Sequence, residues 1–135
     1  MIFVDTSFLV SFAIDKDPNH ARALAMGRIP SQHLQSTEDI MKETLTIISQ
    51  RKGKQFCREF YQNISGYLTI IPITTVRYAA GLARFLDPKT PKDISLIDTI
   101  TAVVCHELGI RRILSFDRHF GLLGLTVIPN KTARS

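Results

Sequence analysis

The sequence predicts an α/β protein in which helices cover both faces of a central, mainly parallel sheet of about five strands. Expected strands and helices alternate along the chain. The expected strands are short, unbroken apolar runs, which are typical of parallel strands buried on both faces. The chain has 135 residues, enough for one hydrophobic core, so we expect a single three-layer α/β/α domain over residues 1–135.

The first elements are expected to be a strand, two short helices and a second strand. Ile2–Val4 is a β-branched and aromatic run that predicts a strand, and a short helix is expected over residues 7–14. Asp17-Pro18-Asn19 predicts the start of the next helix, because proline suits the first helical turn, and Gly27 predicts its end. A short strand is expected at 33–35.

The middle of the chain predicts two consecutive helices. The first is expected to start at Ser36 or Thr37 and to end near Gly53, with two acidic residues at the positive end of its dipole. A second helix is expected at about 54–64, followed by a strand at 67–72.

The C-terminal part is expected to hold two more helices, a polar loop between them, two more strands and a short tail. Glycine closes the second of these helices. The expected ranges are helices 74–86 and 95–108, loop 87–93, strands 111–116 and 125–128, and tail 131–135.

Composition limits the function classes. A net charge of +5 and a sequence pI near 9.5 allow a polyanionic partner but do not require one. No apolar stretch approaches the roughly 20 residues that span a bilayer, and Asp5 interrupts the N-terminal apolar run, unlike a signal peptide. Cys57 and Cys105 are too few for a disulfide framework. We therefore expect a cytoplasmic protein without a membrane partner.

Four acidic residues are notable for their positions. Asp5 and Asp117 follow expected strands, where the ligand crevice of a parallel sheet lies. Each acid also has a simpler interpretation: Asp5 could cap a helix, Asp117 could belong to a turn, and Asp98 could form a capping box with Ser95.

Glu43 is harder to explain without a ligand, because it borders the apolar stripe of its expected helix. Burial would remove hydration from its carboxylate, which is costly unless the charge is paired. A path to solvent, a pair with Lys42 or another cation, or a metal ion would each remove that cost.

Considered together, the four acids favour a metal site. Two carboxylates about 4 Å apart repel by roughly 4 kcal/mol at an effective dielectric constant near 20. Such a cluster needs a cation or raised pKa values. Carboxylate oxygens favour a hard cation, Mg²⁺ or Mn²⁺, and sites of this kind perform phosphoryl chemistry.

Several segments of the sequence resemble PIN-domain proteins, and more narrowly the VapC-type toxin ribonucleases. The matching segments are FVDTSFLV, the helix bearing Glu43, SLIDTITAVVCHELG and ILSFDRHF. The resemblance covers essentially the whole chain. Its most specific parts are the N-terminal segment and residues 95–120, and the segment around Glu43 matches more loosely.

The resemblance implies a PIN-like fold and a metal-dependent endoribonuclease that cuts single-stranded or loop RNA, leaving 5′-phosphate and 3′-hydroxyl ends. It assigns catalytic and Mg²⁺- or Mn²⁺-binding roles to Asp5, Glu43, Asp98 and Asp117. Asp5 and Asp98 are expected to bind the metal directly, and Glu43 and Asp117 to act through water or to hold a second metal. Thr6 matches a small hydroxyl residue that could orient a ligand or a water. The resemblance also implies a toxin–antitoxin pair, with a small antitoxin as partner, and a homodimer.

Two residues beside Asp117 are candidate RNA contacts. Arg118 could hold the RNA backbone against the acids, and His119 could contact a phosphate. No HExxH zinc motif, GxSxG nucleophile elbow or glycine-rich phosphate loop is present in the sequence.

Other functions remain open at this point. A PIN nuclease that processes RNA outside a toxin–antitoxin system, and a non-catalytic domain that binds RNA or protein, fit the same residues. A phosphorylation receiver is less consistent, because Asp5 stands alone and LTIIPIT ends without an acid. A phosphatase with Asp5 as nucleophile usually needs a DxD pair, and position 7 is serine.

Overall fold

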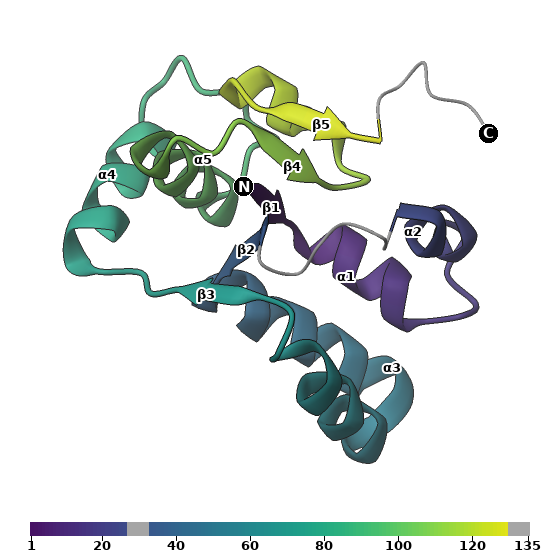
Figure 1. Cartoon of the computed structure of the whole chain (residues 1–135). Coiled ribbons are helices and arrows are strands. Elements are labelled where there is room, and N and C mark those ends of the chain that lie inside the picture. Colours follow the sequence, from purple (N-terminus) through teal and green to yellow (C-terminus); the bar gives the residue numbers. More distant parts are fainter. Residues whose placement is uncertain (27–32, 130–135) are drawn as a thin grey trace.

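The structure, a computed structural model, describes residues 1–26 and 33–129. Its centre is a five-stranded sheet in the order β3-β2-β1-β4-β5, and every neighbouring pair is parallel (Figure 1). The strands are β1 Ile2–Val4, β2 Leu34–Thr37, β3 Thr69–Ile71, β4 Arg112–Leu114 and β5 Thr126–Ile128. The predicted α/β class with a parallel sheet is confirmed.

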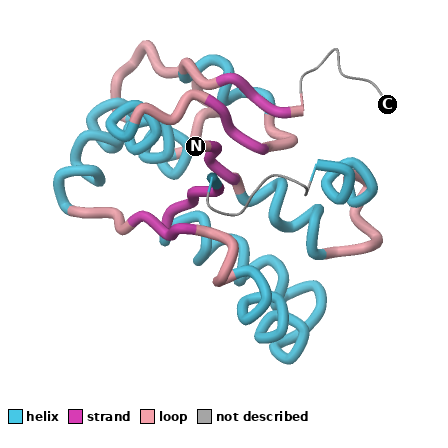
Figure 2. Tube along the Cα trace, viewed as in Figure 1, coloured by secondary structure: helices cyan, strands magenta, loops and turns pink. Residues whose placement is uncertain are grey.

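Helices flank the sheet in two groups. One group packs α1 against α2 and α3, and the other packs α4 against α5 (Figures 1 and 2). The helices are α1 Thr6–Ala13, α2 His20–Met26, α3 Glu38–Ile64, α4 Thr75–Phe85, α5 Leu96–Leu108 and the 3-10 helix η2 Arg118–Leu123. Within the described residues, every helix is too short or too polar to cross a bilayer.

The strand order places a topological switch between β1 and β4, the usual position of a ligand crevice in an open parallel sheet. From β1 the chain first adds strands on one side of the sheet and later adds β4 and β5 on the other. Val4 pairs with Leu114, and the backbone N–H of Asp5 donates to the carbonyl of Leu114 at 3.0 Å. The residues after β1 and after β4 therefore meet at one edge.

The predicted helix boundaries follow side-chain caps. Asp5 caps α1, and Thr37 caps α3 through a bond from the Ile40 N–H. Ser95 and Asp98 form a complete capping box on α5, which ends at Gly109 with φ 70°.

α3 consists of two helical segments that meet at Gly53, whose φ of 86° and ψ of 171° are not helical. The predicted break near Gly53 and the second helical segment from Lys54 are therefore confirmed. The two segments form one long element that is kinked at Gly53. The predicted helix end at Gly27 and the predicted tail 131–135 lie outside the described residues.

β2, β3, β4 and β5 each differ from their predicted ranges by one or two residues at an end, and two of these differences have a clear cause. β2 continues to Thr37 rather than ending at Gln35, because the Ser36 hydroxyl donates to the Val4 carbonyl at 2.9 Å and can be buried there. β4 ends at Leu114 rather than Phe116. The Ser115 N–H still donates to the Ile128 carbonyl of β5, but the N–H groups of Phe116 and Asp117 donate to serine hydroxyls instead of a strand. No helix was predicted for the residues of η2.

Close packing of α4 on α5 positions the start of α5. A Cβ atom on Gly81 would lie 2.8 Å from the Cα of Ile100, so the two helices approach more closely than a side chain at position 81 allows. The Thr99 hydroxyl donates to the Gly81 carbonyl at 2.9 Å. This contact holds the first turn of α5, which carries Asp98.

Candidate active site

Asp5 is a buried carboxylate at the centre of this edge, with 6% of its surface exposed. Its Oδ2 accepts three hydrogen bonds, from the Ser7 N–H at 3.3 Å, the Ser7 hydroxyl at 2.9 Å and the Ser115 hydroxyl at 2.9 Å. Burial raises the pKa of Asp5, and the hydrogen bonds from Ser115 and Ser7 offset only part of that rise. The side chain both caps α1 and carries a desolvated charge.

The two serines also fix the backbone that follows β4. The Ser7 hydroxyl accepts from the Phe116 N–H at 2.9 Å, and the Ser115 hydroxyl accepts from the Asp117 N–H at 2.9 Å. Their two oxygens lie 3.0 Å apart. Sequence reasoning missed both as site residues, although each hydroxyl lies within three residues of the end of a buried strand at the switch point.

Asp98 and Asp117 meet on either side of the His119 ring. The Nε2 atom of His119 lies 2.7 Å from Asp98 Oδ2, and its Nδ1 atom lies 2.8 Å from Asp117 Oδ1. Neither short contact lies along a ring N–H direction. The Nε2 atom is buried and, despite its contact with Asp98, forms no regular hydrogen bond. Desolvation raises the pKa of Asp117, His119 opposes the rise and Asp98 adds to it.

Three of the four predicted acids are thus connected through intermediate side chains. Ser115 links Asp5 to the backbone of Asp117, and His119 lies between Asp117 and Asp98. Asp117 follows β4 by three residues rather than by one. The backbone between them leaves the sheet and is held by hydrogen bonds to the two serine hydroxyls.

Glu43 lies apart from this group. It is exposed on α3, so of the three explanations left open for this residue the path to solvent applies. It lines a cleft of about 730 Å³ together with Leu96 and Ile97, the two residues before Asp98. Among the described side chains, Glu43 has no hydrogen bond or ion pair with the other three acids, and residues 1–26 and 33–129 contain no ready-made group of three metal-ligating side chains.

Thr6 and Arg118 differ in their surroundings. The Thr6 hydroxyl donates to the Ile40 carbonyl at 3.4 Å and accepts from the Thr44 hydroxyl at 3.3 Å, so it holds α1 against α3. Arg118 is exposed at the start of η2, and its side chain forms no ion pair with the described residues.

The types of donor atom at this edge fit a hard divalent cation. Asp5, Asp98 and Asp117 offer carboxylate oxygens, which Mg²⁺ and Mn²⁺ prefer. The histidine ring lies within 2.8 Å of two of these carboxylates, and one of them, Asp98, also accepts the Ser95 N–H of the capping box. The carboxylates can therefore hold a cation at the edge where the residues after β1 and β4 meet.

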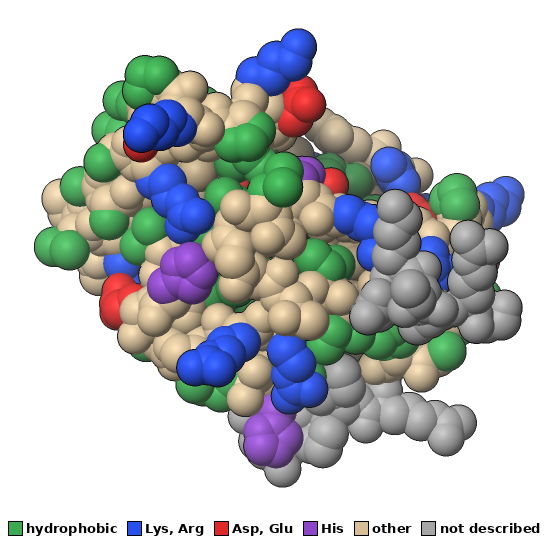
Figure 3. All heavy atoms as spheres, turned by 90° about the horizontal axis from the view of Figure 1, so that it is seen from above, with side chains coloured by type: hydrophobic (Ala, Val, Ile, Leu, Met, Phe, Trp, Pro, Cys, Tyr) green, Lys and Arg blue, Asp and Glu red, His purple; other side chains and the backbone are tan. Residues whose placement is uncertain are grey.

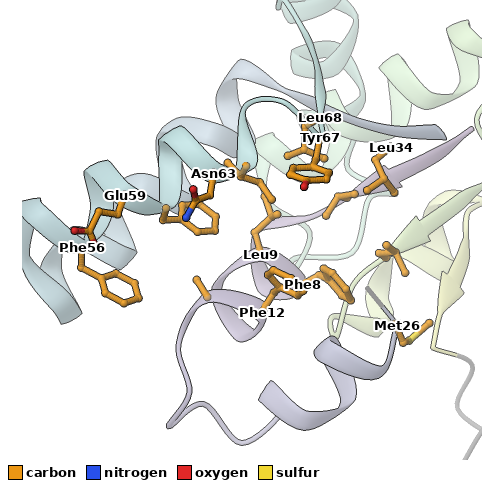
Figure 4. A pocket seen from close by; sticks show the side chains of 15 residues that line it. Phe8, Leu9, Phe12, Met26, Leu34, Phe56, Glu59, Asn63, Tyr67 and Leu68 are labelled. Carbon is orange, nitrogen blue, oxygen red and sulfur yellow. The ribbon is translucent and has the colours of Figure 1, made fainter. Parts of the chain in front are cut away.

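Other surface features of the molecule do not share this chemistry. Lys and Arg side chains are scattered over the face in Figure 3 rather than gathered into one patch. A second cavity of about 580 Å³ lies between α1 and the second half of α3 (Figure 4). Its lining is apolar apart from Glu59, Asn63 and Tyr67, so it lacks the clustered carboxylates of the edge.

Comparison with known proteins gives a family and several structural neighbours. The family model described as PIN domain matches residues 2–124. VapC20 of Mycobacterium tuberculosis, described as a sarcin-ricin loop cleaving toxin, is similar with a TM-score of 0.84 and 20% identity, over 93% of this chain and 97% of that chain.

Two further solved structures have the same fold. VapBC2 of Rickettsia felis, bound to a DNA fragment from their promoter, matches with a TM-score of 0.69 and 13% identity, over 94% of this chain and 97% of that one. FitAcB of Neisseria gonorrhoeae matches with a TM-score of 0.66 and 16% identity, over 94% and 96%. No curated protein sequence matches the chain.

Proposed function

Because this chain belongs to the PIN domain family, we propose that it is a metal-dependent endoribonuclease whose active site is the β1–β4 edge. The observation that carries the proposal is the connected group of acids, in which Ser115 and His119 join Asp5, Asp117 and Asp98. Three connected carboxylates at the carboxyl ends of parallel strands favour phosphoryl chemistry over the functions left open by the sequence.

In this proposal, Asp5, Asp98 and Asp117 hold Mg²⁺ or Mn²⁺, and Glu43 reaches the site from the neighbouring cleft. A bound divalent cation makes water a better nucleophile at neutral pH and stabilises the leaving oxygen. All three hydrogen bonds to Asp5 end on Oδ2, so Oδ1 is the atom we assign to the ligand. Asp98 and Asp117, which lie on either side of the His119 ring, would hold the cation with Asp5.

The remaining side chains would position rather than react. Ser7 and Ser115 hold the Asp5 carboxylate in one orientation, and Thr6 keeps α1 in place on α3. Arg118 and His119, next to Asp117, are proposed contacts for the RNA backbone.

We further propose that the protein is the toxin of a toxin–antitoxin pair, with a small antitoxin as partner and a homodimer as its own assembly. The description of VapC20 as a toxin that cleaves the sarcin-ricin loop supports single-stranded or loop RNA as substrate. The VapBC2 structure, and a further similar structure of FitAB bound to a DNA fragment, support a DNA-bound complex with a second protein.

The test is cleavage of an end-labelled, structured RNA by the full chain with Mg²⁺, with Mn²⁺ and with EDTA. The proposal predicts fragments only when metal is present, and these fragments should carry 5′-phosphates that a ligase accepts without prior phosphorylation. Cleavage that persists in EDTA would contradict the metal requirement. If a panel of tRNA, ribosomal and messenger fragments stays intact and calorimetry detects no metal binding, the non-catalytic binding domain becomes the better account.

A further inference from the structure

An aromatic residue, Phe116, is connected by hydrogen bonds to the acid group, by which we mean Asp5, Asp98 and Asp117. Phe116 immediately precedes Asp117, and its backbone N–H donates to the Ser7 hydroxyl at 2.9 Å. That hydroxyl donates in turn to Asp5 Oδ2 at 2.9 Å. The position of Phe116 is therefore set by the same network that orients the central carboxylate.

The ring of Phe116 is held in one orientation. It is half-buried and stacks on Phe8 of α1, with ring centroids 5.9 Å apart and an interplanar angle of 14°. Phe8 stacks in turn on Phe12 at 6.3 Å. Stacking of this kind fixes a ring that would otherwise rotate at the protein surface.

A cation lies over this ring. The guanidinium carbon of Arg22, an exposed residue of α2, is 5.2 Å from the centroid of Phe116. Its Nη1 atom donates to Asn19 Oδ1 at 3.4 Å. Arg51 and Arg77 pair with Asp17 and Glu107, whereas Arg22 has no carboxylate partner within the described part of the chain.

We propose that Arg22, held over Phe116, binds a phosphate of the RNA strand beside the acid group. This inference rests on the proposed ribonuclease function. RNA must bring a negatively charged backbone to a site that is itself lined by acids, so an unpaired cation near them offsets the repulsion. A guanidinium matches phosphate with two parallel N–H bonds, and its plane can also stack on a base.

The position of Arg22 distinguishes it from the other exposed basic residues. Its contact to Phe116 limits its conformations, so less freedom is lost when it binds a phosphate. It also adds α2 to the proposed RNA surface, which otherwise draws its contacts from the start of η2, where Arg118 lies. A purely structural role, in which Arg22 only fastens α2 to the loop after β4, is the competing explanation.

Binding without cleavage separates the two explanations. In the full chain carrying Asp5→Asn, binding of a fluorescein-labelled single-stranded RNA is measured by anisotropy at several salt concentrations with Mg²⁺ present. The variants are Arg22→Gln, Arg22→Lys and the control Arg58→Gln, which removes the same charge from the exposed face of α3. A thermal melt of each variant reports on folding.

We expect Arg22→Gln to weaken binding severalfold and to reduce the slope of log K against log salt by about 0.7, the value for one phosphate on a single strand. Arg22→Lys should restore the slope, while Arg58→Gln leaves it unchanged. An unchanged slope in Arg22→Gln, or an equal loss in Arg58→Gln, would overturn the inference while leaving the nuclease intact. If wild-type protein neither binds nor cuts RNA, the proposed function itself fails.

Discussion

Ser115 and Asp5 are 110 positions apart in the sequence, yet the Ser115 hydroxyl donates a 2.9 Å hydrogen bond to Asp5 Oδ2. This bond crosses the switch point between β1 and β4 and ends on a carboxylate that is only 6% exposed. The same hydroxyl accepts the Asp117 N–H. One serine thus sets the relative positions of two proposed metal ligands.

The variant Ser115→Ala should weaken the site without removing an acid. The Ser115 bond lowers the pKa of Asp5, so its loss raises that pKa further and moves the acid limb of the pH–rate profile to higher pH. Loss of a hydrogen bond to a buried charge should also lower the free energy of unfolding by about 1.5–3 kcal/mol.

Ser65→Ala is the matched control, because among the described residues the Ser65 hydroxyl bonds only to the Gln62 carbonyl, at an exposed position. It should leave both quantities near wild type. Superimposable pH–rate profiles for Ser115→Ala and wild type would show that the Ser115 bond does not tune Asp5.

The charge of Asp5 should destabilise the fold when no metal is present. Because burial raises its folded pKa, the native state holds the proton more tightly than the unfolded state, whose pKa is about 3.9. Below that pH both states are neutral and there is no penalty. As pH rises from there through the folded pKa, the wild type loses about 1.4 kcal/mol for each unit of difference.

Asp5→Asn, measured in EDTA, should therefore be more stable than wild type at pH 7, and the difference should shrink towards pH 4. Urea denaturation at several pH values measures it. If wild type instead gains stability relative to Asp5→Asn as pH rises, the predicted direction of the pH effect is wrong.

Divalent metal should stabilise the folded chain. A ligand that binds only the native state adds about 2.7 kcal/mol at a concentration 100 times its Kd, so Mn²⁺ should raise the melting temperature in a dose-dependent way. Asp98→Asn should abolish most of that increase. Asp93→Asn, an exposed aspartate in the preceding loop, should keep it. Equal increases in both variants would argue against Asp98 as a ligand.

The α4–α5 contact should tolerate no side chain at position 81. Gly81→Ala would place a Cβ atom 2.8 Å from the Cα of Ile100, so the helices must separate and the free energy of unfolding should fall by about 1–3 kcal/mol. Gly66→Ala is the control, because a Cβ atom there meets nothing within 4 Å. Chemical denaturation compares the two, and equal stability would mean that the contact relaxes freely.

Much of the fold could be predicted from local signals. Apolar runs gave the strands, and the caps at Asp5, Thr37 and Gly109 gave helix boundaries. The short polar end of β2 could not be predicted, because Ser36 is buried only through a bond to Val4, a contact that depends on tertiary structure. The six residues of η2 carry no periodic apolar pattern long enough to recognise.

The site was predicted less completely than the fold. The structure brings the candidates Asp5, Asp98 and Asp117 together, as expected for strand ends and an early helix turn that converge at a switch point. The serines between them were missed, since pairing Ser7 with Ser115 requires knowing that β1 and β4 are neighbours. The environment of Glu43 was left open between solvent, an ion pair and a metal, because helical periodicity gives the face of a helix but not the width of the cleft beside it.

The central claim is that Asp5 belongs to a metal-dependent site that cleaves RNA. The most direct measurement is the cleavage rate of one labelled RNA at a series of Mn²⁺ concentrations for wild type, Asp5→Asn and Asp93→Asn. We predict that wild type and Asp93→Asn share one metal dependence, while Asp5→Asn is slower by at least about 100-fold. An Asp5→Asn variant that cuts at the wild-type rate with the wild-type metal dependence would contradict the claim.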